Sequence, residues 1–488
     1  MPHRPLFRHL IPFVCLLIAV WGGLVWDIDA AWFGHHDANG AWISTGAQHL
    51  NTYGIGRVGI IPAINIRPDL DATFAYYTHH PPLIVWVVAL NQALFGIHEA
   101  SARLGSAASA LISVAAFFVL VRRIANIRWA FASTLAYAFV PMFLFFGRLP
   151  NHEAYALAEI LLFAAVFVAW DRHPTRARWW MLAALAVLGV WTAWAAPFVI
   201  GLIAFAVFIA NPQRRMGIIG LGIVSMIALA ALLIAYEATS PGALRDLASA
   251  FSGRSSTTSD FYQASSAANF TTADWLTRQF ADLLAFMSPL VIVFGVVGFP
   301  VILRQLRRDA RALALGMLAA GLLYVLVLRN ATYEHEFYKI YLLPPLAIST
   351  GGLIAHLLCH KPNRPLWRVL RMAIFPIAAL SLIWSVFLLI RLHNFTDPAA
   401  HQIALSVRDF ARPDDFVMTN LPRVTTPMHY YANTYITVQP EINRAMDTLA
   451  SIAPNRGVLV VWCGGDPPAD WRDYPVERDA FCAYIRLR

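Results

Sequence analysis

Long apolar stretches, separated by short basic or longer polar segments, dominate the pattern along the chain. About eleven of them approach the roughly 20 apolar residues that a helix needs to cross a hydrocarbon layer of about 30 Å. They run over Ile11–Trp26, Leu104–Leu120, Trp129–Phe146, Ala154–Trp170, Trp179–Trp194, Pro197–Ala210, Gly217–Tyr236, Leu283–Leu303, Ala312–Leu328, Tyr338–Leu358 and Ala373–Leu392. The region from Trp179 to Ala210 could form one long helix instead of two short ones. We therefore predict an α-helical polytopic membrane protein with about eleven transmembrane helices.

The composition excludes a soluble globular protein. Of the 488 residues, 58% are hydrophobic and 13% are charged, and the mean hydropathy is +0.56. Soluble proteins carry roughly a quarter of charged residues. Most of this chain therefore has no surface that is suited to water.

The positions of the basic residues behind the net charge of +9 indicate the topology of the chain, not an anionic ligand. Basic residues gather in every second loop, as the positive-inside rule expects. These clusters are Arg4 with Arg8, Arg122–Arg128, Arg172–Arg178, Arg214 with Arg215, Arg304–Arg311 and Lys361–Arg371. The pattern predicts a cytoplasmic N-terminus and an outer C-terminus, and it gives no reason to expect a nucleic-acid partner.

Two outer loops and a polar C-terminal segment complete the predicted organisation. The first outer loop, residues 29–101, contains the short apolar run Pro82–Phe95, which we expect to lie along the interface as an amphipathic helix. The second, residues 237–282, is rich in Ser, Thr and Ala, a composition typical of a mobile loop. Residues 394–488 contain short β-branched stretches and a helical stretch near Ile442–Ile452, which predict a small soluble α/β domain. We thus expect a membrane domain over residues 1–393.

The four cysteines are too few for a disulfide framework. Cys463 and Cys482 share the outer C-terminal segment. They form either one disulfide or two buried free thiols, and the sequence leaves this open.

Several short motifs follow one another on the outer side. They are Asp37 after the first span, His80-Pro81-Pro82-Leu83 with Trp86, Leu94-Phe95-Gly96, Ala102-Arg103-Leu104, Gly147–Glu153, and His335–Lys339 before Leu343-Pro344-Pro345-Leu346. In this order they resemble the polyprenyl-phosphate-dependent glycosyltransferases of the GT-C superfamily. The branch resembled contains protein O-mannosyltransferases, lipid A aminoarabinose transferases and Rgt-type enzymes. The resemblance covers nearly the whole chain.

The resemblance implies an inverting transfer of a monosaccharide from a polyprenyl-phosphate carrier, such as undecaprenyl phosphate, to an acceptor hydroxyl. Such a transfer needs a base that removes the proton of the attacking hydroxyl. Asp37 matches the catalytic carboxylate of the family, although the same residue would also serve as a helix N-cap. Glu153 matches the second acidic position, where it would orient the acceptor or a cationic partner. A helix N-terminus would favour an acid there in any case.

Positive charge or hydrogen-bond donors must also stabilise the departing phosphate. Several relatives place Lys immediately before the Pro of the PPL motif, whereas this chain has His80 there, preceded by His79. Lys339 either clamps the phosphate or extends to the interface, as lysines at span ends do. The remaining phosphate-binding candidates, all on the outer side, are His335, Tyr338, Arg57, Arg148 and Arg329.

The resemblance implies no required cofactor, but the paired histidines leave a divalent metal open, with His79 and His36 as its ligands. The expected partners are the lipid-linked sugar donor, membrane lipids and a lipid A, glycan, glycolipid or protein acceptor. The expected location is a bacterial inner membrane, with the C-terminal domain in the periplasm. A lipid-linked glycan transporter, flippase or ligase is the alternative; a transporter would show inverted repeats, and we see none in the sequence.

Overall fold

The computed structural model describes residues 5–66, 74–257, 270–359, 365–412, 415–421, 425–438, 457–467 and 474–487. The chain forms two compact units. The first comprises Met1–Ile28, Thr78–Leu83 and Leu104–Arg391, and the second comprises Asp29–Tyr77, Ile84–Arg103 and Leu392–Arg488. The second unit thus joins the first outer loop to the C-terminal segment, which the sequence assigns to separate domains.

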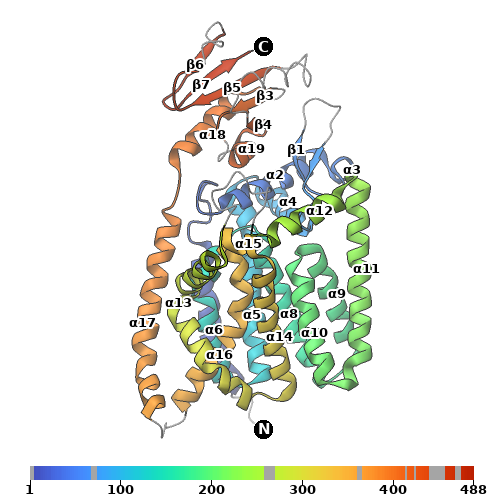
Figure 1. The fold of residues 1–488 in the computed structure, drawn as a ribbon, viewed down its shortest axis with the longest axis vertical. Helices are drawn as coiled ribbons and strands as arrows, with labels where there is room; N and C mark the ends of the chain where they lie inside the picture. Colours follow the sequence, from blue (N-terminus) through green and yellow to red (C-terminus); the bar gives the residue numbers. More distant parts are fainter. Residues whose placement is uncertain are drawn as a thin grey trace. The chain divides into compact units, whose positions relative to one another are not determined.

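The first unit is built from helices (Figure 1). They are α1 (Pro5–Val25), α5 (Glu99–Ile124), α6 (Ile127–Ala138), α7 (Pro141–Phe146), α8 (His152–Arg172), α9 (Arg176–Thr192), α10 (Ala195–Ala210), α11 (Arg215–Thr239), α12 (Ala243–Ser255), α13 (Thr272–Gln305), α14 (Arg308–Val327), α15 (Arg329–Glu334), the 3-10 helix η3 (Glu336–Leu342), α16 (Leu343–Cys359) and α17 (Pro365–His393). Among the described residues, seven helices are long and apolar enough to cross a membrane. The predicted class of fold, a polytopic helical membrane protein, is confirmed.

Every predicted apolar stretch lies on a helix, but some of these helices are short or broken. The stretch Trp129–Phe146 divides into α6 and α7 because Pro141, at the first position of α7, cannot continue the preceding helix. The stretch Trp179–Ala210 forms two helices, α9 and α10, because Ala193 between them has an extended backbone. The estimate of about eleven spans therefore counts segments that are shorter than a membrane-crossing helix.

Small residues let the helices of the first unit approach one another closely. A Cβ atom added at Gly298 of α13 would lie 2.4 Å from the carbonyl oxygen of Ser349 in α16. A Cβ atom at Gly352 would lie 2.2 Å from the ring of Trp129 in α6. Small residues are the usual means of close helix contact in membranes, where lipid removes the hydrophobic drive for helix association.

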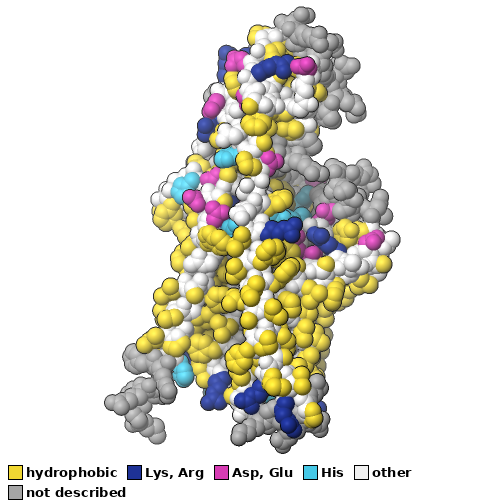
Figure 2. Space-filling model, turned by 90° about the vertical axis from the view of Figure 1, so that its left-hand side faces the viewer, with side chains coloured by type: hydrophobic (Ala, Val, Ile, Leu, Met, Phe, Trp, Pro, Cys, Tyr) yellow, Lys and Arg dark blue, Asp and Glu magenta, His cyan; other side chains and the backbone are white. Residues whose placement is uncertain are grey.

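The outer surface of the first unit is suited to lipid. Hydrophobic side chains form a broad yellow band over the helices in Figure 2, and Lys and Arg side chains lie at the lower edge of this band as well as above it. In α11 and in α17, only 22% of the apolar 18-residue stretch is buried by other parts of the protein. The rest of each stretch needs an apolar surrounding such as lipid. Arg172 donates to the carbonyl oxygen of Arg123 and Arg178 to that of Ala169. The chain is therefore a membrane protein.

Part of the second outer segment is helical. The Ser-rich composition of residues 237–282 predicts a mobile loop; residues 258–269 of it lie outside the described residues, and the described part includes α12 and the first turns of α13. Leu244, Leu247, Phe251 and Arg254 recur at helical spacing within α12, and this periodicity explains the helix.

The second unit combines short helices with two sheets. Its first part contains α2 (Asp37–Tyr53), α3 (Ile55–Val58), the antiparallel pair β1 (Ala63–Ile66) and β2 (Phe74–Tyr76), and most of α4 (Leu83–Phe95). The predicted amphipathic run Pro82–Phe95 is thus helical.

The C-terminal part of this unit is α/β. A sheet in the order β4-β3-β5-β7-β6 is formed by β3 (Phe416–Thr419), β4 (Tyr435–Val438), β5 (Val458–Cys463), β6 (Val476–Arg478) and β7 (Cys482–Arg486). Its first three strands are parallel, and β7 is antiparallel to both of its neighbours, β5 and β6. The helices α18 (Pro398–Phe410) and α19 (Thr425–Ala432) contribute to the core beside it. The predicted helix near Ile442–Ile452 lies outside the described residues.

The two cysteines of the C-terminal segment form a disulfide. Cys463 of β5 and Cys482 of β7 face each other across the antiparallel pair, with their Cα atoms 4.2 Å apart. This resolves the alternative that the sequence leaves open.

Candidate functional site

A cavity of about 600 Å³ lies within the first unit. Apolar side chains from α10, α11, α12 and α14 supply most of its wall, among them Phe198, Leu233, Leu247, Phe251 and Val327. Its polar lining consists mainly of His80, His152, Glu153, Arg254, Tyr324, Tyr338 and Tyr341. A long apolar wall beside a compact polar group suits a ligand with an apolar chain and a polar head.

Arg254 and His80 form the basic part of this lining. The guanidinium nitrogen Nη2 of Arg254 lies 3.1 Å from Nε2 of His80. Arg254 stands in the last turn of α12, one helical step beyond Phe251, so the helix that supplies apolar wall also supplies the charge.

The protonation state of His80 follows from its contact with Arg254. A guanidinium can only donate hydrogen bonds, so Nε2 of His80 must accept and cannot carry a proton. Burial, together with the charges of His152 and Arg254, places the pKa of His80 well below its usual value. His80 is therefore neutral near pH 7 and holds Arg254, while Arg254 provides the permanent charge. The expectation that His80 itself binds the donor phosphate stays a prediction.

The loop that carries the two histidines is anchored by its backbone. The hydroxyl of Tyr236 donates to the carbonyl oxygen of His80 over 2.6 Å, and Nε1 of Trp194 donates to that of His79 over 2.8 Å. The ring of His80 also stacks on that of His152, with centroids 4.2 Å apart. These contacts place the predicted His79 and His80 beside α8. Desolvation is the main reason why the pKa of His79 is lowered.

Glu153 lies in the first turn of α8 and lines the cavity. Its side chain is buried, and the charge of Arg254 acts on its carboxylate. The structure thus brings together four of the predicted residues, His80, Glu153, Tyr338 and His79, although His79 does not line the cavity itself.

Lys339 takes a position that does not fit a phosphate clamp. Its ammonium group is fully buried, 2.9 Å from Oδ2 of Asp282 in α13, and it also donates to the carbonyl oxygen of Thr332. Lys339 does not line the cavity. Its charge therefore joins η3 to α13 and α15, and these contacts give no support to the prediction that it binds phosphate or extends to the interface.

Three more predicted basic residues of the first unit also make structural contacts. Arg148 is buried and donates to the carbonyl oxygens of Trp26 and Asp27, at the end of α1. Arg329 lies over the ring of Trp275, with its guanidinium carbon 5.8 Å from the centroid. The ring of His335 stacks on Phe337. None of these three residues lines the cavity.

Asp37 begins α2 in the second unit and is held on both of its oxygens. Arg103 lies 3.2 Å from Oδ1, and the backbone N–H of Gly34 donates to Oδ2 over 2.8 Å. Both side chains are buried, with 0% of Arg103 exposed. Arg57, also in this unit, is exposed and lies over the ring of Tyr53.

The histidines suggested as metal ligands belong to different units. His36, which precedes α2 in a left-handed conformation, is part of the second unit, and His79 is part of the first. Neither unit forms this ligand pair by itself, so a divalent metal stays a prediction that rests on the sequence.

Arg254 is the main residue that sequence reasoning missed. The Ser- and Thr-rich segment around it suggested a loop, whereas the spacing of Leu244, Leu247 and Phe251 was the signal of a helix. Arg103 appears in one of the outer motifs, but only the structure shows that it pairs with Asp37.

Comparisons with known proteins agree with this fold. Residues 79–238 match the family of dolichyl-phosphate-mannose-protein mannosyltransferases. No curated protein matches the chain. ArnT from Cupriavidus metallidurans bound to undecaprenyl phosphate is a similar structure, with a TM-score of 0.67, 13% identity, and coverage of 98% of this chain and 97% of ArnT.

The oligosaccharyltransferase of Archaeoglobus fulgidus is also similar. Its apo form gives a TM-score of 0.64 at 13% identity over 93% of this chain and 70% of that one. The oligosaccharyltransferase AglB from Archaeoglobus fulgidus, in complex with an inhibitory peptide and a dolichol-phosphate, gives a TM-score of 0.61 at 11% identity, over 93% of this chain and 69% of that one. The outer motifs, the match over residues 79–238 and the shared architecture lead to one conclusion: this chain has the fold of the GT-C glycosyltransferases and resembles their polyprenyl-phosphate-dependent branch.

Proposed function

We propose that this protein is an inverting glycosyltransferase that moves a monosaccharide from a polyprenyl-phosphate carrier to an acceptor hydroxyl on the periplasmic face of a bacterial inner membrane. The observation that carries the proposal is the cavity of the first unit, in which an apolar wall meets the Arg254–His80 pair. A polyprenyl phosphate has the matching chemistry, an apolar chain that ends in an anion.

The donor phosphate would be bound by Arg254. A guanidinium recognises phosphate through charge-assisted hydrogen bonds, and it keeps its charge at any physiological pH. The neutral imidazole of His80 accepts from Nη2 of Arg254 and so fixes the direction of the guanidinium. The prenyl chain would lie against Leu247, Phe251 and Leu233.

In the proposed reaction, the acceptor oxygen attacks the anomeric carbon and forms a new C–O bond. The bond between that carbon and the phosphate oxygen breaks, and its electron pair leaves with the polyprenyl phosphate. Arg254 would stabilise the charge that develops on this leaving group. The acceptor proton would pass to Asp37, which we propose as the base because of its position in the outer motifs. Glu153 would orient the sugar or the acceptor.

Likeness to ArnT bound to undecaprenyl phosphate and to AglB in complex with a dolichol-phosphate supports a lipid-phosphate carrier. The acceptor would carry a free hydroxyl on lipid A, a glycan, a glycolipid or a protein. The disulfide between Cys463 and Cys482 supports the assignment of the second unit to the periplasm.

Binding of undecaprenyl phosphate to the full-length protein in lipid nanodiscs tests this proposal. We expect Arg254→Gln to weaken binding about 10- to 100-fold, as the loss of hydrogen bonds to a charged group would. Arg245→Gln is the matched control, because Arg245 lies on the same helix, is exposed and does not line the cavity. Equal affinities of the Arg254→Gln variant and the parent protein would remove the donor site from this cavity.

A further inference from the structure

The carboxylate of Asp37 is fixed by residues that precede and follow it in the chain. Arg103 holds Oδ1, and the N–H of Gly34 holds Oδ2. Arg103 also donates to the carbonyl oxygen of Ala30. The direction of the carboxylate therefore depends on where segment 30–34 and the first turn of α5 lie.

Trp32 sets the position of Arg103. The guanidinium carbon of Arg103 lies 3.9 Å from the centroid of the Trp32 ring, and both side chains are fully buried. The backbone of α2 also lies against this ring, because a Cβ atom at Gly40 would lie 2.2 Å from it. A buried guanidinium stacked on an indole is held in one plane, and this plane orients the N–H groups that face Asp37.

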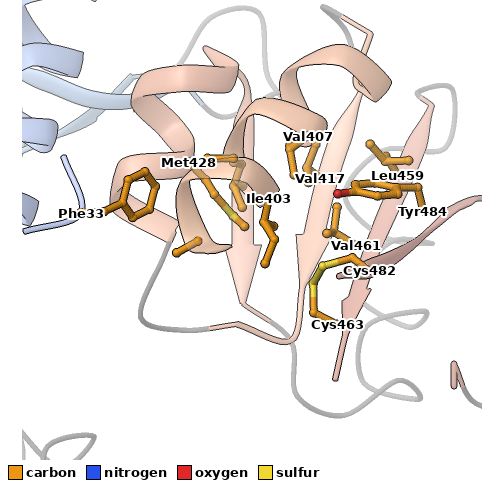
Figure 3. Close-up of a cluster of buried hydrophobic side chains, with 13 residues drawn as sticks. Phe33, Ile403, Val407, Val417, Met428, Leu459, Val461, Cys463, Cys482 and Tyr484 are labelled. Atoms are coloured by element: carbon orange, nitrogen blue, oxygen red, sulfur yellow. A yellow bond between two sulfur atoms is a disulfide. The ribbon is translucent and has the colours of Figure 1, made fainter. Parts of the chain in front are cut away.

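The segment that carries Trp32 is built into the C-terminal α/β core. Phe33 belongs to the cluster of buried hydrophobic side chains that includes Met428 and Ile403 (Figure 3). The N–H of Asp397 donates to the carbonyl oxygen of Phe33, and Gly34 forms a β-bridge with Thr396. Residues close to 400 positions apart in the sequence thus share one core.

The hydroxyl of Tyr431 in α19 contacts both the segment that carries Trp32 and the helix that carries Arg103. This oxygen accepts the backbone N–H of Trp32 over 3.0 Å and donates to Oε1 of Glu99 over 2.5 Å. Glu99 begins α5 and stands four residues before Arg103, so the two lie on the same face of that helix. One side chain of the C-terminal domain therefore fixes both the residue on which Arg103 stacks and the helix that carries Arg103.

From these contacts we infer that the C-terminal α/β domain positions Asp37, and that Tyr431 is the positioning residue through which it acts. The inference rests on the proposed role of Asp37 as the base. It assigns the C-terminal domain a part in the transfer reaction in addition to any part in acceptor choice. A base must be held close to its productive geometry, and supporting contacts of this kind provide that precision.

Carbodiimide modification of Asp37, followed by peptide mass spectrometry on the full-length protein in nanodiscs, tests the inference without a sugar donor. We expect Tyr431→Phe to speed the modification of Asp37 at least about threefold, because the Arg103 contact shields the carboxylate less often. Glu99→Leu should have the same effect, because it removes the acceptor on α5 and leaves the core around Tyr431 intact. In the Arg103→Lys background, Tyr431→Phe should add little.

Two controls separate positioning from general loosening of the domain. Asp415 is an internal control, because it is buried in the same unit and paired with Arg486 at 2.8 Å. Tyr484→Phe is the matched variant, because it also removes a tyrosine hydroxyl bonded to a carboxylate, that of Asp479. Faster modification of Asp37 alone supports the inference. An unchanged rate at Asp37, or an equal rise at Asp415, overturns it.

The proposed function is tested separately in the same membranes. Radiolabelled polyprenyl-phosphate sugars extracted from the source organism serve as donors, and transfer to membrane acceptors is measured. If Asp37→Asn transfers sugar as fast as the parent while Tyr431→Phe still exposes Asp37, the proposed function fails but the structural link stands. If Asp37→Asn is inactive and Tyr431→Phe lowers turnover about tenfold or more while Tyr484→Phe does not, both hold.

Discussion

Replacement of Lys339 by Met is expected to destabilise the protein without weakening the binding of a donor phosphate. The ammonium of Lys339 has no exposed surface, lies 2.9 Å from Oδ2 of Asp282 and also donates to Thr332. Removal of one partner of a buried ion pair costs about 3–5 kcal/mol, because the other charge is left without compensation. Arg278 lies 3.2 Å from the same carboxylate oxygen, so we expect a cost near the lower limit, about 3 kcal/mol.

The assay combines thermal unfolding, followed by tryptophan fluorescence, with the affinity for undecaprenyl phosphate in nanodiscs. Lys339→Met should lower the unfolding midpoint. The double variant Lys339→Met/Asp282→Leu should recover most of the loss, because it removes both charges and fills similar volume. Both variants should bind undecaprenyl phosphate as the parent does. A double variant that is stable but binds the lipid tenfold more weakly or worse would show that Lys339 does contact the phosphate, and would refute this reasoning.

Two further predictions concern the stability of the second unit. Burial lowers the pKa of His429 from 6.5 to about 4, so the unfolded state takes up the proton first. Stability that is present above pH 6.5 should fall by up to about 3 kcal/mol as the pH drops to 4, and His429→Gln should remove this part of the pH dependence of unfolding. Replacement of Cys463 and Cys482 by Ser opens a loop with a sequence separation of 19 and should cost about 3 kcal/mol of unfolding free energy, seen as a lower midpoint of the thermal transition. An unaltered pH profile, or an unaltered midpoint in the serine variant, would contradict the respective expectation.

The helices could be predicted from the sequence because lipid imposes a simple rule. Each apolar stretch must satisfy its own backbone, so it must be helical, and the apolar pattern alone identifies it. The breaks at Pro141 and Ala193 are local features of the backbone that this pattern does not specify.

The polar residues were harder to predict, because their roles depend on partners that are distant in the sequence. The sequence left Lys339 open between phosphate binding and the interface, and only the structure shows Asp282, 57 residues away, beside it. Arg103 was part of a motif, but its contact with Asp37 spans 66 positions. Arg254 was hidden by the composition of its segment, although the helical spacing of its apolar neighbours was readable.

The division into units could not be read from the sequence for a similar reason. The segment that contains Trp32 and Phe33 follows the first span directly, so chain order favours the membrane domain. Phe33 instead completes a core with residues from α18 and α19, because burial beside Met428 satisfies an aromatic ring that would otherwise face water.

The most direct test of the account is a structure of the full-length protein in nanodiscs with undecaprenyl phosphate added. We predict that the phosphate lies within hydrogen-bonding distance of the guanidinium of Arg254, with the prenyl chain against Leu247 and Phe251. A phosphate bound elsewhere, with Arg254 turned away from it, would contradict the donor site proposed for this protein.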